Sequence, residues 1–337
     1  MRRVGLPKSL RLISLLTILA ITLIITADII SAEQRVLIYT KTAGFRHASI
    51  PNGIKAFEKL GKQHGIHMFN TENEKHFEDE DWVNGWDAMV FLSVSGTMLN
   101  DKGAVNMMKY IENGGGYMGV HEACDAMYKS PWYGRLVGAY FDYHPYIQHF
   151  TLDVETHDHP STSFLNKTWE VYDEVYTFNS NPRDLGKKVV LTADSKSFKD
   201  PTGPGLSILR KTEGVHPIAW YAEGGLLDEP KHNPGGGVMD TSKTPKNQRG
   251  SGGPGRSFYT GLGHTHACWE EKNMVDHVWG GLKWVLDSPT IRSNNATLPA
   301  SAPGTKFVVH TPSSSASTSN ASQTAASTSM KICCSWQ

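Results

Sequence analysis

Short apolar runs in the first half of the chain alternate with segments of helical periodicity. Between the runs, apolar residues recur every three or four positions, and these segments end at glycines, which predicts helices. Continuous apolar runs rich in β-branched residues are typical of strands buried on both faces. Together they predict an α/β fold with a mostly parallel, doubly wound sheet and flavodoxin-like layering. The predicted strands are 35–40, 66–69, 87–93 and 117–121.

The second half of the chain has a different pattern. Additional strand-like segments follow Pro145, and a helix with a buried face of Val275, Val278, Leu282 and Leu286 comes last. A stretch over 224–255 is rich in glycine and has no periodicity, which predicts an insertion or a lid. The additional strands are predicted at 150–155, 171–178, 187–194, 216–223 and 256–263.

The first 32 residues have the pattern of an export signal. Four basic residues precede an apolar run of 16 residues over 12–27, and small residues lie just before Glu33. The run is shorter than the roughly 20 residues that a membrane helix needs. We therefore expect a signal peptide over 1–32, a secreted or cell-surface protein, and no membrane span after cleavage. An uncleaved signal anchor is the alternative.

The C-terminal residues 291–337 have no apolar periodicity. The stretch 311–329 contains 12 Ser or Thr among 19 residues, which predicts a disordered, solvated tail. The last eight residues are too few and too polar for the hydrophobic tail of a lipid-anchor signal. The folded domain is thus expected over 33–290. Three glycosylation sequons fit an export route, at Asn166, Asn295 and Asn320.

Composition narrows the class of protein. The chain has 33 basic and 33 acidic residues, and loss of residues 1–32 leaves 29 basic against 32 acidic, a net charge of −3. Such a balance argues against a nucleic-acid partner. With 39% apolar residues, the chain is not disordered as a whole.

Histidines follow three of the predicted strands. His47 comes after the first strand, His121 after the fourth and His264 after the last. In a parallel sheet these carboxyl ends share one edge, where α/β proteins bind their ligands. We therefore predict that the three imidazoles share a functional pocket.

The segment GGGYMGVHEACDA over 114–126 resembles the nucleophile elbow of the class I glutamine amidotransferase-like fold. The elbow position holds His121 where those enzymes have a nucleophile, so no glutaminase activity is expected. Further motifs, FRHASI (45–50), DEVYTFNSNPRD (173–184), HPIAWY (216–221) and SFYTGLGHTH (257–266), make residues 34–287 similar to the ThuA-like family, named for trehalose utilisation. The resemblance implies that fold and a link to disaccharide or oxidised-sugar metabolism.

Two cysteines lie beside the expected site. Cys124 follows the elbow and Cys268 follows the last strand-end loop, and the fold implied by the resemblance brings these loops together. In an oxidising compartment a Cys124–Cys268 disulfide would clamp the pocket. Two unrelated buried thiols are the alternative.

Our first functional hypothesis is a hydrolase or lyase that acts on a disaccharide, glycoside or keto-sugar. A ketone acidifies the neighbouring C–H bond, so a histidine can abstract that proton while the glycosidic oxygen leaves. His121 would be the base, Glu122 its orienting partner and His264 the acid. Substrate would be held by Arg46, His47, His144, Asp173 and Glu174, with Phe45, Tyr140, Phe141 and Tyr143 as candidates for stacking on the sugar.

Two other hypotheses remain open. The first is a metal-dependent hydrolase, in which a divalent ion binds to His47, His121, Glu122 and His264. The second is a non-catalytic carbohydrate-binding or cell-surface module. In all three cases the expected partner is a small carbohydrate.

Overall fold

The structure is a computed structural model that describes residues 34–201, 216–223 and 255–288, all within one compact unit. The predicted signal peptide, almost all of the glycine-rich insertion, the Ser/Thr-rich tail, Asn295 and Asn320 lie outside the described residues. Within them, no helix is both long enough and apolar enough to cross a membrane.

The first half of the domain alternates strands with helices, as the hydrophobic pattern predicted. Strands β1, β3 and β4 are buried along almost their whole length, because helices cover both faces of the sheet. Short 3₁₀ turns η1 (Glu74–Glu78) and η2 (His121–Cys124) connect neighbouring elements. The elements are β1 (Arg35–Tyr39), α2 (Ile50–His64), β2 (His67–Thr71), α3 (Glu80–Asn84), β3 (Ala88–Leu92), α4 (Asp101–Glu112), β4 (Gly116–Val120) and α5 (Pro131–Val137).

The second half adds the remaining strands and the last helix. These are β5 (Phe141–Tyr143), β6 (Gln148–Val154), β7 (Thr168–Asp173), β8 (Thr177–Phe178), β9 (Lys188–Ala193), β10 (Pro217–Ala222), β11 (Ser257–Thr260) and α6 (Lys272–Leu286), with 3₁₀ turns η3 (Pro182–Leu185) and η7 (Ala267–Glu270). The main sheet of the described residues has nine strands in the order β2-β1-β3-β4-β11-β10-β9-β6-β7.

Strand directions confirm the predicted α/β class. Strands β2, β1, β3, β4 and β11 run parallel to one another, and β10, β9, β6 and β7 extend the sheet in antiparallel pairs. The carboxyl ends of β1, β4 and β11 therefore lie at one edge. Strand β10 runs opposite to β11, and β9, β6 and β7 each reverse direction again. Strand β7 is therefore parallel to β11, and its carboxyl end lies at the same edge.

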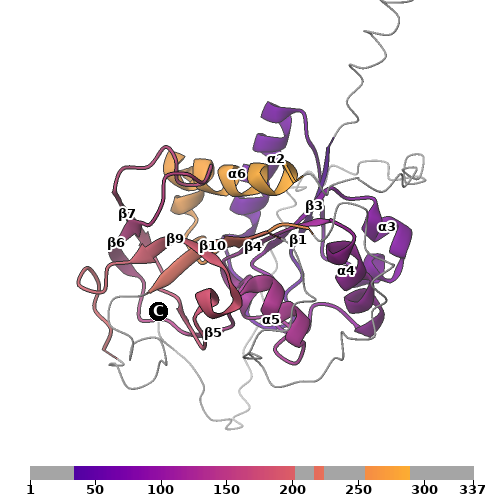
Figure 1. The fold of residues 1–337 in the computed structure, drawn as a ribbon, viewed down its shortest axis with the longest axis horizontal. Helices are drawn as coiled ribbons and strands as arrows, with labels where there is room; N and C mark the ends of the chain where they lie inside the picture. Colours follow the sequence, from indigo (N-terminus) through magenta and orange to yellow (C-terminus); the bar gives the residue numbers. More distant parts are fainter. Residues whose placement is uncertain (1–33, 202–215, 224–254, 289–337) are drawn as a thin grey trace, which may run out of the picture. The chain divides into compact units, whose positions relative to one another are not determined.

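The sheet separates two layers of apolar side chains. Helices α2 and α6 cover one face, where Phe57, Met118 and Leu282 belong to the first core cluster. Helices α3, α4 and α5 cover the other face, with Tyr117 and Trp132 in the second cluster (Figure 1).

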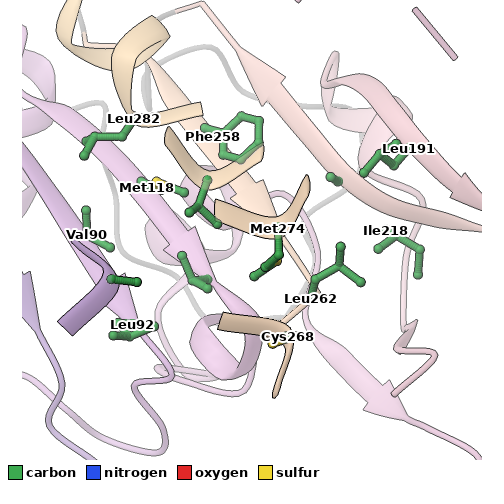
Figure 2. Packing of buried hydrophobic residues seen from close by; sticks show 14 of the residues in the cluster. Val90, Leu92, Met118, Leu191, Ile218, Phe258, Leu262, Cys268, Met274 and Leu282 are labelled. Atoms are coloured by element: carbon green, nitrogen blue, oxygen red, sulfur yellow. The ribbon is translucent and has the colours of Figure 1, made fainter. Parts of the chain in front are cut away.

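The predicted disulfide is wrong, because its two cysteines lie in different layers. Cys124 is fully buried in the second cluster, where the Tyr259 hydroxyl lies 3.0 Å from its sulfur. Cys268 belongs to the first cluster, beside Met274 and Leu262 (Figure 2), and its thiol contacts the Thr265 carbonyl at 3.0 Å. Both are free thiols.

The segment 171–178 was predicted as one strand but is two. Strand β7 ends at Asp173, and β8 begins at Thr177 and pairs with β5 in a separate two-stranded sheet. The three residues between them leave the β-ladder. This interruption places Glu174 and Tyr176 at the edge of the sheet that carries the histidines.

Candidate functional site

His121 occupies a strained backbone position at the end of β4. Its φ is 54°, in the left-handed region that side chains other than glycine rarely adopt. The imidazole is fully buried, and its Nδ1 lies 2.8 Å from the Gly261 carbonyl. A carbonyl only accepts hydrogen bonds, so Nδ1 donates and the lone pair of the neutral ring is on Nε2. The strand-to-helix turn thus aims one side chain into the site, as an elbow does.

Gly263 allows the last strand-end loop to approach this elbow. Its φ is 137°, and a Cβ built on it would lie 3.2 Å from the Cβ of His121. A side chain here would therefore be strained by its backbone and would crowd the histidine. Ser49 donates a hydrogen bond to the Gly263 carbonyl at 2.8 Å, which connects the start of α2 to the same loop.

His47 lies between His121 and Glu122. Its Nε2 is 3.0 Å from Nε2 of His121, and its Nδ1 is 2.8 Å from the Glu122 carboxyl group. Burial lowers the pKa of His47 to about 4 and raises the pKa of Glu122 to about 9. At neutral pH the contact is therefore a hydrogen bond between neutral groups rather than an ion pair.

Burial also lowers the pKa of His121 well below its ordinary value, and the neighbouring His47 lowers it further. The neutral ring has one lone pair, on Nε2. Three groups surround that atom: His47 Nε2 at 3.0 Å, the Tyr176 hydroxyl at 3.0 Å and Glu174 Oε2 at 3.5 Å. One lone pair accepts one strong hydrogen bond, so the Tyr176 hydroxyl and the His47 imidazole cannot both donate a strong hydrogen bond to Nε2 of His121.

Glu174 connects the remaining two histidines. Its Oε2 is 3.1 Å from Nδ1 of His264, and its Oε1 is 3.3 Å from Nε2 of His144. Burial alone would lower the pKa of His264, but the Glu174 and Asp173 carboxylates outweigh it and raise that pKa above its usual value. Glu174 Oε2 and His264 Nδ1 are buried, and despite their proximity neither makes a hydrogen bond of normal geometry within the described residues.

Asp173 holds the loops of the site in position. Its carboxylate accepts hydrogen bonds from the backbone N–H groups of Gly263, His264 and Glu174 at 2.9, 3.2 and 2.8 Å. Its side chain is fully buried, and burial raises its pKa to about 6. These hydrogen bonds connect β7 to the loop after β11, so the buried Asp173 carboxylate positions that loop.

Four of these side chains form a group that could hold a metal ion. One ligand atom from each of His47, His121, Glu174 and His264 lies within 4.8 Å of the others. Glu122, which was expected in this set, contacts Nδ1 of His47 instead. The predicted metal ligands thus need one correction, since the carboxylate of the group is Glu174.

The structure brings the three strand-end histidines together, and the ring centroids of His47 and His264 are 4.9 Å apart. His144 joins them at the exposed side. Arg46, in contrast, is directed to the surface, where its guanidinium pairs with Glu72 at 2.7 Å, so its expected place in the pocket is wrong.

Tyr176 is the site residue that the sequence analysis missed. It is buried, its ring stacks on His121 at 4.6 Å, and its hydroxyl lies 3.0 Å from Nε2 of that ring. The motif DEVYTFNSNPRD contains it, but as part of a predicted continuous strand it had no special position. Tyr176 is two residues from Glu174, and residues two apart in a strand lie on the same face. This spacing was the sequence signal that could have identified it.

Fold and site together define an α/β protein with a mostly parallel sheet and a histidine at the turn after β4. A family model described as "ThuA: Trehalose utilisation" matches residues 35–285. The chain belongs to the ThuA family.

Two solved structures share the fold. A putative ThuA-like protein from Bacteroides uniformis is 19% identical, with 76% of this chain and 92% of that chain covered and a TM-score of 0.54. One from Parabacteroides merdae is 15% identical, with coverage of 76% and 90% and a TM-score of 0.51. Comparison with curated proteins gave no match.

Proposed function

We propose that this chain is an exported, metal-dependent enzyme of the ThuA family that acts on a small carbohydrate. The observation that carries the proposal is the convergence of His47, His121, Glu174 and His264 on one point. The reaction is hydrolysis or elimination of a disaccharide, glycoside or keto-sugar. Export is supported by the pattern of residues 1–32, and the carbohydrate class by the family's link to trehalose utilisation.

Three of the six distances among the ligand atoms of this group are close to those of a coordination shell, and all six are within 4.8 Å. Ligands at about 2.1 Å from a tetrahedral ion are about 3.4 Å apart. Here Nε2 of His121 is 3.0 Å from Nε2 of His47 and 3.5 Å from Glu174 Oε2, which is 3.1 Å from Nδ1 of His264. An ion among them would coordinate Glu174 Oε2 and His264 Nδ1, which lie 3.1 Å apart without a hydrogen bond of normal geometry.

The groups behind the histidines support the same assignment. Metal-bound histidines usually donate their second N–H to a carboxylate or a carbonyl, which fixes the ring and its tautomer. Nδ1 of His121 contacts the Gly261 carbonyl, and Nδ1 of His47 contacts Glu122. Both imidazoles also stay neutral at pH 7, because burial lowers their pKa values, and a neutral ring is the form that coordinates.

Bound there, a divalent ion would act as a Lewis acid that polarises a carbonyl or hydroxyl oxygen of the substrate. His121 is fully buried, so it is a poor candidate for direct proton abstraction. His144 lies outside the ligand group, and 36% of its side chain is exposed. We assign it the transfer of a proton: it takes the C–H proton next to a ketone, a C=C bond forms, and the glycosidic oxygen leaves with its electron pair and takes the proton from the His144 imidazolium.

The experiment combines elemental analysis with a turnover assay of the purified chain. We expect one equivalent of zinc or a similar ion, and release of sugar from a 3-keto-disaccharide or a plain disaccharide. Glu174→Gln and His121→Ala should lose both. His149→Ala, an exposed histidine outside the cluster, is the matched control and should keep both.

Three results would contradict the proposal. Active protein without metal would exclude the ion, and turnover that survives Glu174→Gln would exclude its site. Sugar binding without turnover, retained in His121→Ala and His264→Ala, would instead indicate a non-catalytic carbohydrate-binding module.

A further inference from the structure

Phe45 is an exposed aromatic residue beside an otherwise buried cluster. Its side chain is 64% exposed, whereas His47, which its ring contacts edge-on at a centroid distance of 4.8 Å, is 5% exposed. Single exposed apolar side chains are common on protein surfaces, so the feature that distinguishes Phe45 is its direct contact with a histidine of the buried cluster. One face of the ring is therefore available to a ligand that reaches the cluster.

The backbone around Phe45 is fixed. The Ser95 hydroxyl donates to the Phe45 carbonyl at 2.6 Å and accepts from the Gly44 N–H at 3.2 Å, and the Ala43 N–H donates to the Ser95 carbonyl at 2.8 Å. These bonds fasten the loop after β1 to the loop after β3. These hydrogen bonds hold the ring in its exposed position before a ligand binds. Binding therefore does not have to order this loop.

The other aromatic residues considered for sugar stacking are engaged elsewhere. Tyr140 is fully buried, and its hydroxyl contacts the carbonyls of Met127 and Ser130. Tyr143 donates to Asp200 at 2.8 Å, and Phe141 packs on Tyr176 at 4.7 Å. Phe45 is the member of this set that combines high exposure with direct contact to the cluster.

We propose that the open face of Phe45 is a sugar-binding subsite beside the His/Glu cluster. A pyranose ring has one face of C–H groups and an edge of hydroxyl groups. The C–H face would pack on Phe45, and the hydroxyl or carbonyl edge would point to His264 and His144, whose side chains are 30% and 36% exposed. This inference rests on the proposed function for its substrate class, and it adds the residue that holds the ring.

The test measures sugar binding, turnover and metal content separately. Trehalose, cellobiose and their 3-keto derivatives are titrated by calorimetry into the full exported chain, its Phe45→Ala and Phe45→Tyr variants, and Phe164→Ala. Phe164 is 41% exposed and lies in the β6–β7 connection, so it controls for the loss of an exposed phenylalanine ring.

We expect Phe45→Ala to raise Kd or KM roughly 5- to 10-fold, with kcat and metal content unchanged. Phe45→Tyr and Phe164→Ala should stay within about twofold of the native chain. Phe45→Ala with native affinity would overturn the subsite, as would a native chain that binds none of the four sugars. Loss of metal in Phe45→Ala would assign the ring a structural role instead. If turnover is absent but Phe45→Ala still weakens binding, the proposed function fails and the subsite stands.

Discussion

His277 gives the domain a sensitivity to acid that can be calculated. It lies in α6, is fully buried, and contacts the Ser161 carbonyl at 2.9 Å and the Thr260 hydroxyl at 3.1 Å. Burial lowers its pKa to about 4 from an ordinary value of 6.5. The neutral ring is therefore favoured in the folded state, whereas in the unfolded chain the ring is protonated below pH 6.5.

The sign follows from linkage. The stability associated with the neutral ring is fully present above pH 6.5 and is lost as pH falls toward 4, because the unfolded chain binds the proton more tightly. Between pH 7.5 and 4.5, a pKa difference of this size lowers the free energy of unfolding by about 2.5 kcal/mol. That is a large share of the roughly 5–15 kcal/mol that stabilises an ordinary domain.

The assay is urea unfolding followed by circular dichroism at the two pH values. His277→Gln removes the titrating group, so its loss of stability between pH 7.5 and 4.5 should be about 2.5 kcal/mol smaller than that of the native chain. His149→Gln, at an exposed position, should leave the pH dependence unchanged. A difference below about 1 kcal/mol, or an NMR titration that places the His277 pKa near 6.5, would refute the reasoning.

Three further predictions follow. Glu122→Ala removes the hydrogen-bond partner of His47 Nδ1, so the affinity of the cluster for zinc, measured by competition with a chelator, should fall roughly 10- to 100-fold; an unchanged affinity would exclude its supporting role. Reduction should leave the mass of the chain unchanged at Cys124 and Cys268, and both should react with iodoacetamide only after unfolding; fast labelling of the folded protein would contradict their burial. Passage through a eukaryotic secretory route should add an N-glycan at Asn166, which is exposed, and Thr168→Ala should abolish it; an unmodified Asn166 in exported protein would show that the sequon is not used.

Local pattern was sufficient to predict most of the sheet. Runs such as 87–93 correspond to strands because both faces of the sheet are covered, which leaves no polar side of the strand to interrupt them. The end of β7 at Asp173 could not be predicted in this way. The alternation of side chains continues through 171–178, but the ladder ends where Asp173 pairs with Gln148, the first residue of β6, and the Asp173 carboxylate accepts a hydrogen bond from Gly263 in a distant loop.

The site was predictable in its histidines but less so in its carboxylates. His121 and His264 follow apolar runs, so the parallel topology alone places them at one edge. Glu122 directly follows His121 in the sequence and was the predicted carboxylate ligand. Glu174 instead comes from the residues after β7, the last strand in the order of the sheet. The buried position of His277 agrees with its spacing of three residues from Met274, which places both on the inner face of α6.

The position of β11 determines when this site can form during synthesis. It is the last strand of the described residues, yet it lies in the middle of the sheet, between β4 and β10. A nascent chain that has not yet emerged past about Thr260 has two half-sheets with no strand to join them, and it lacks the loop that carries His264. Nearly the whole domain must therefore be synthesised before the two half-sheets can join. Metal binding at the cluster would then follow this late step of folding, not precede it.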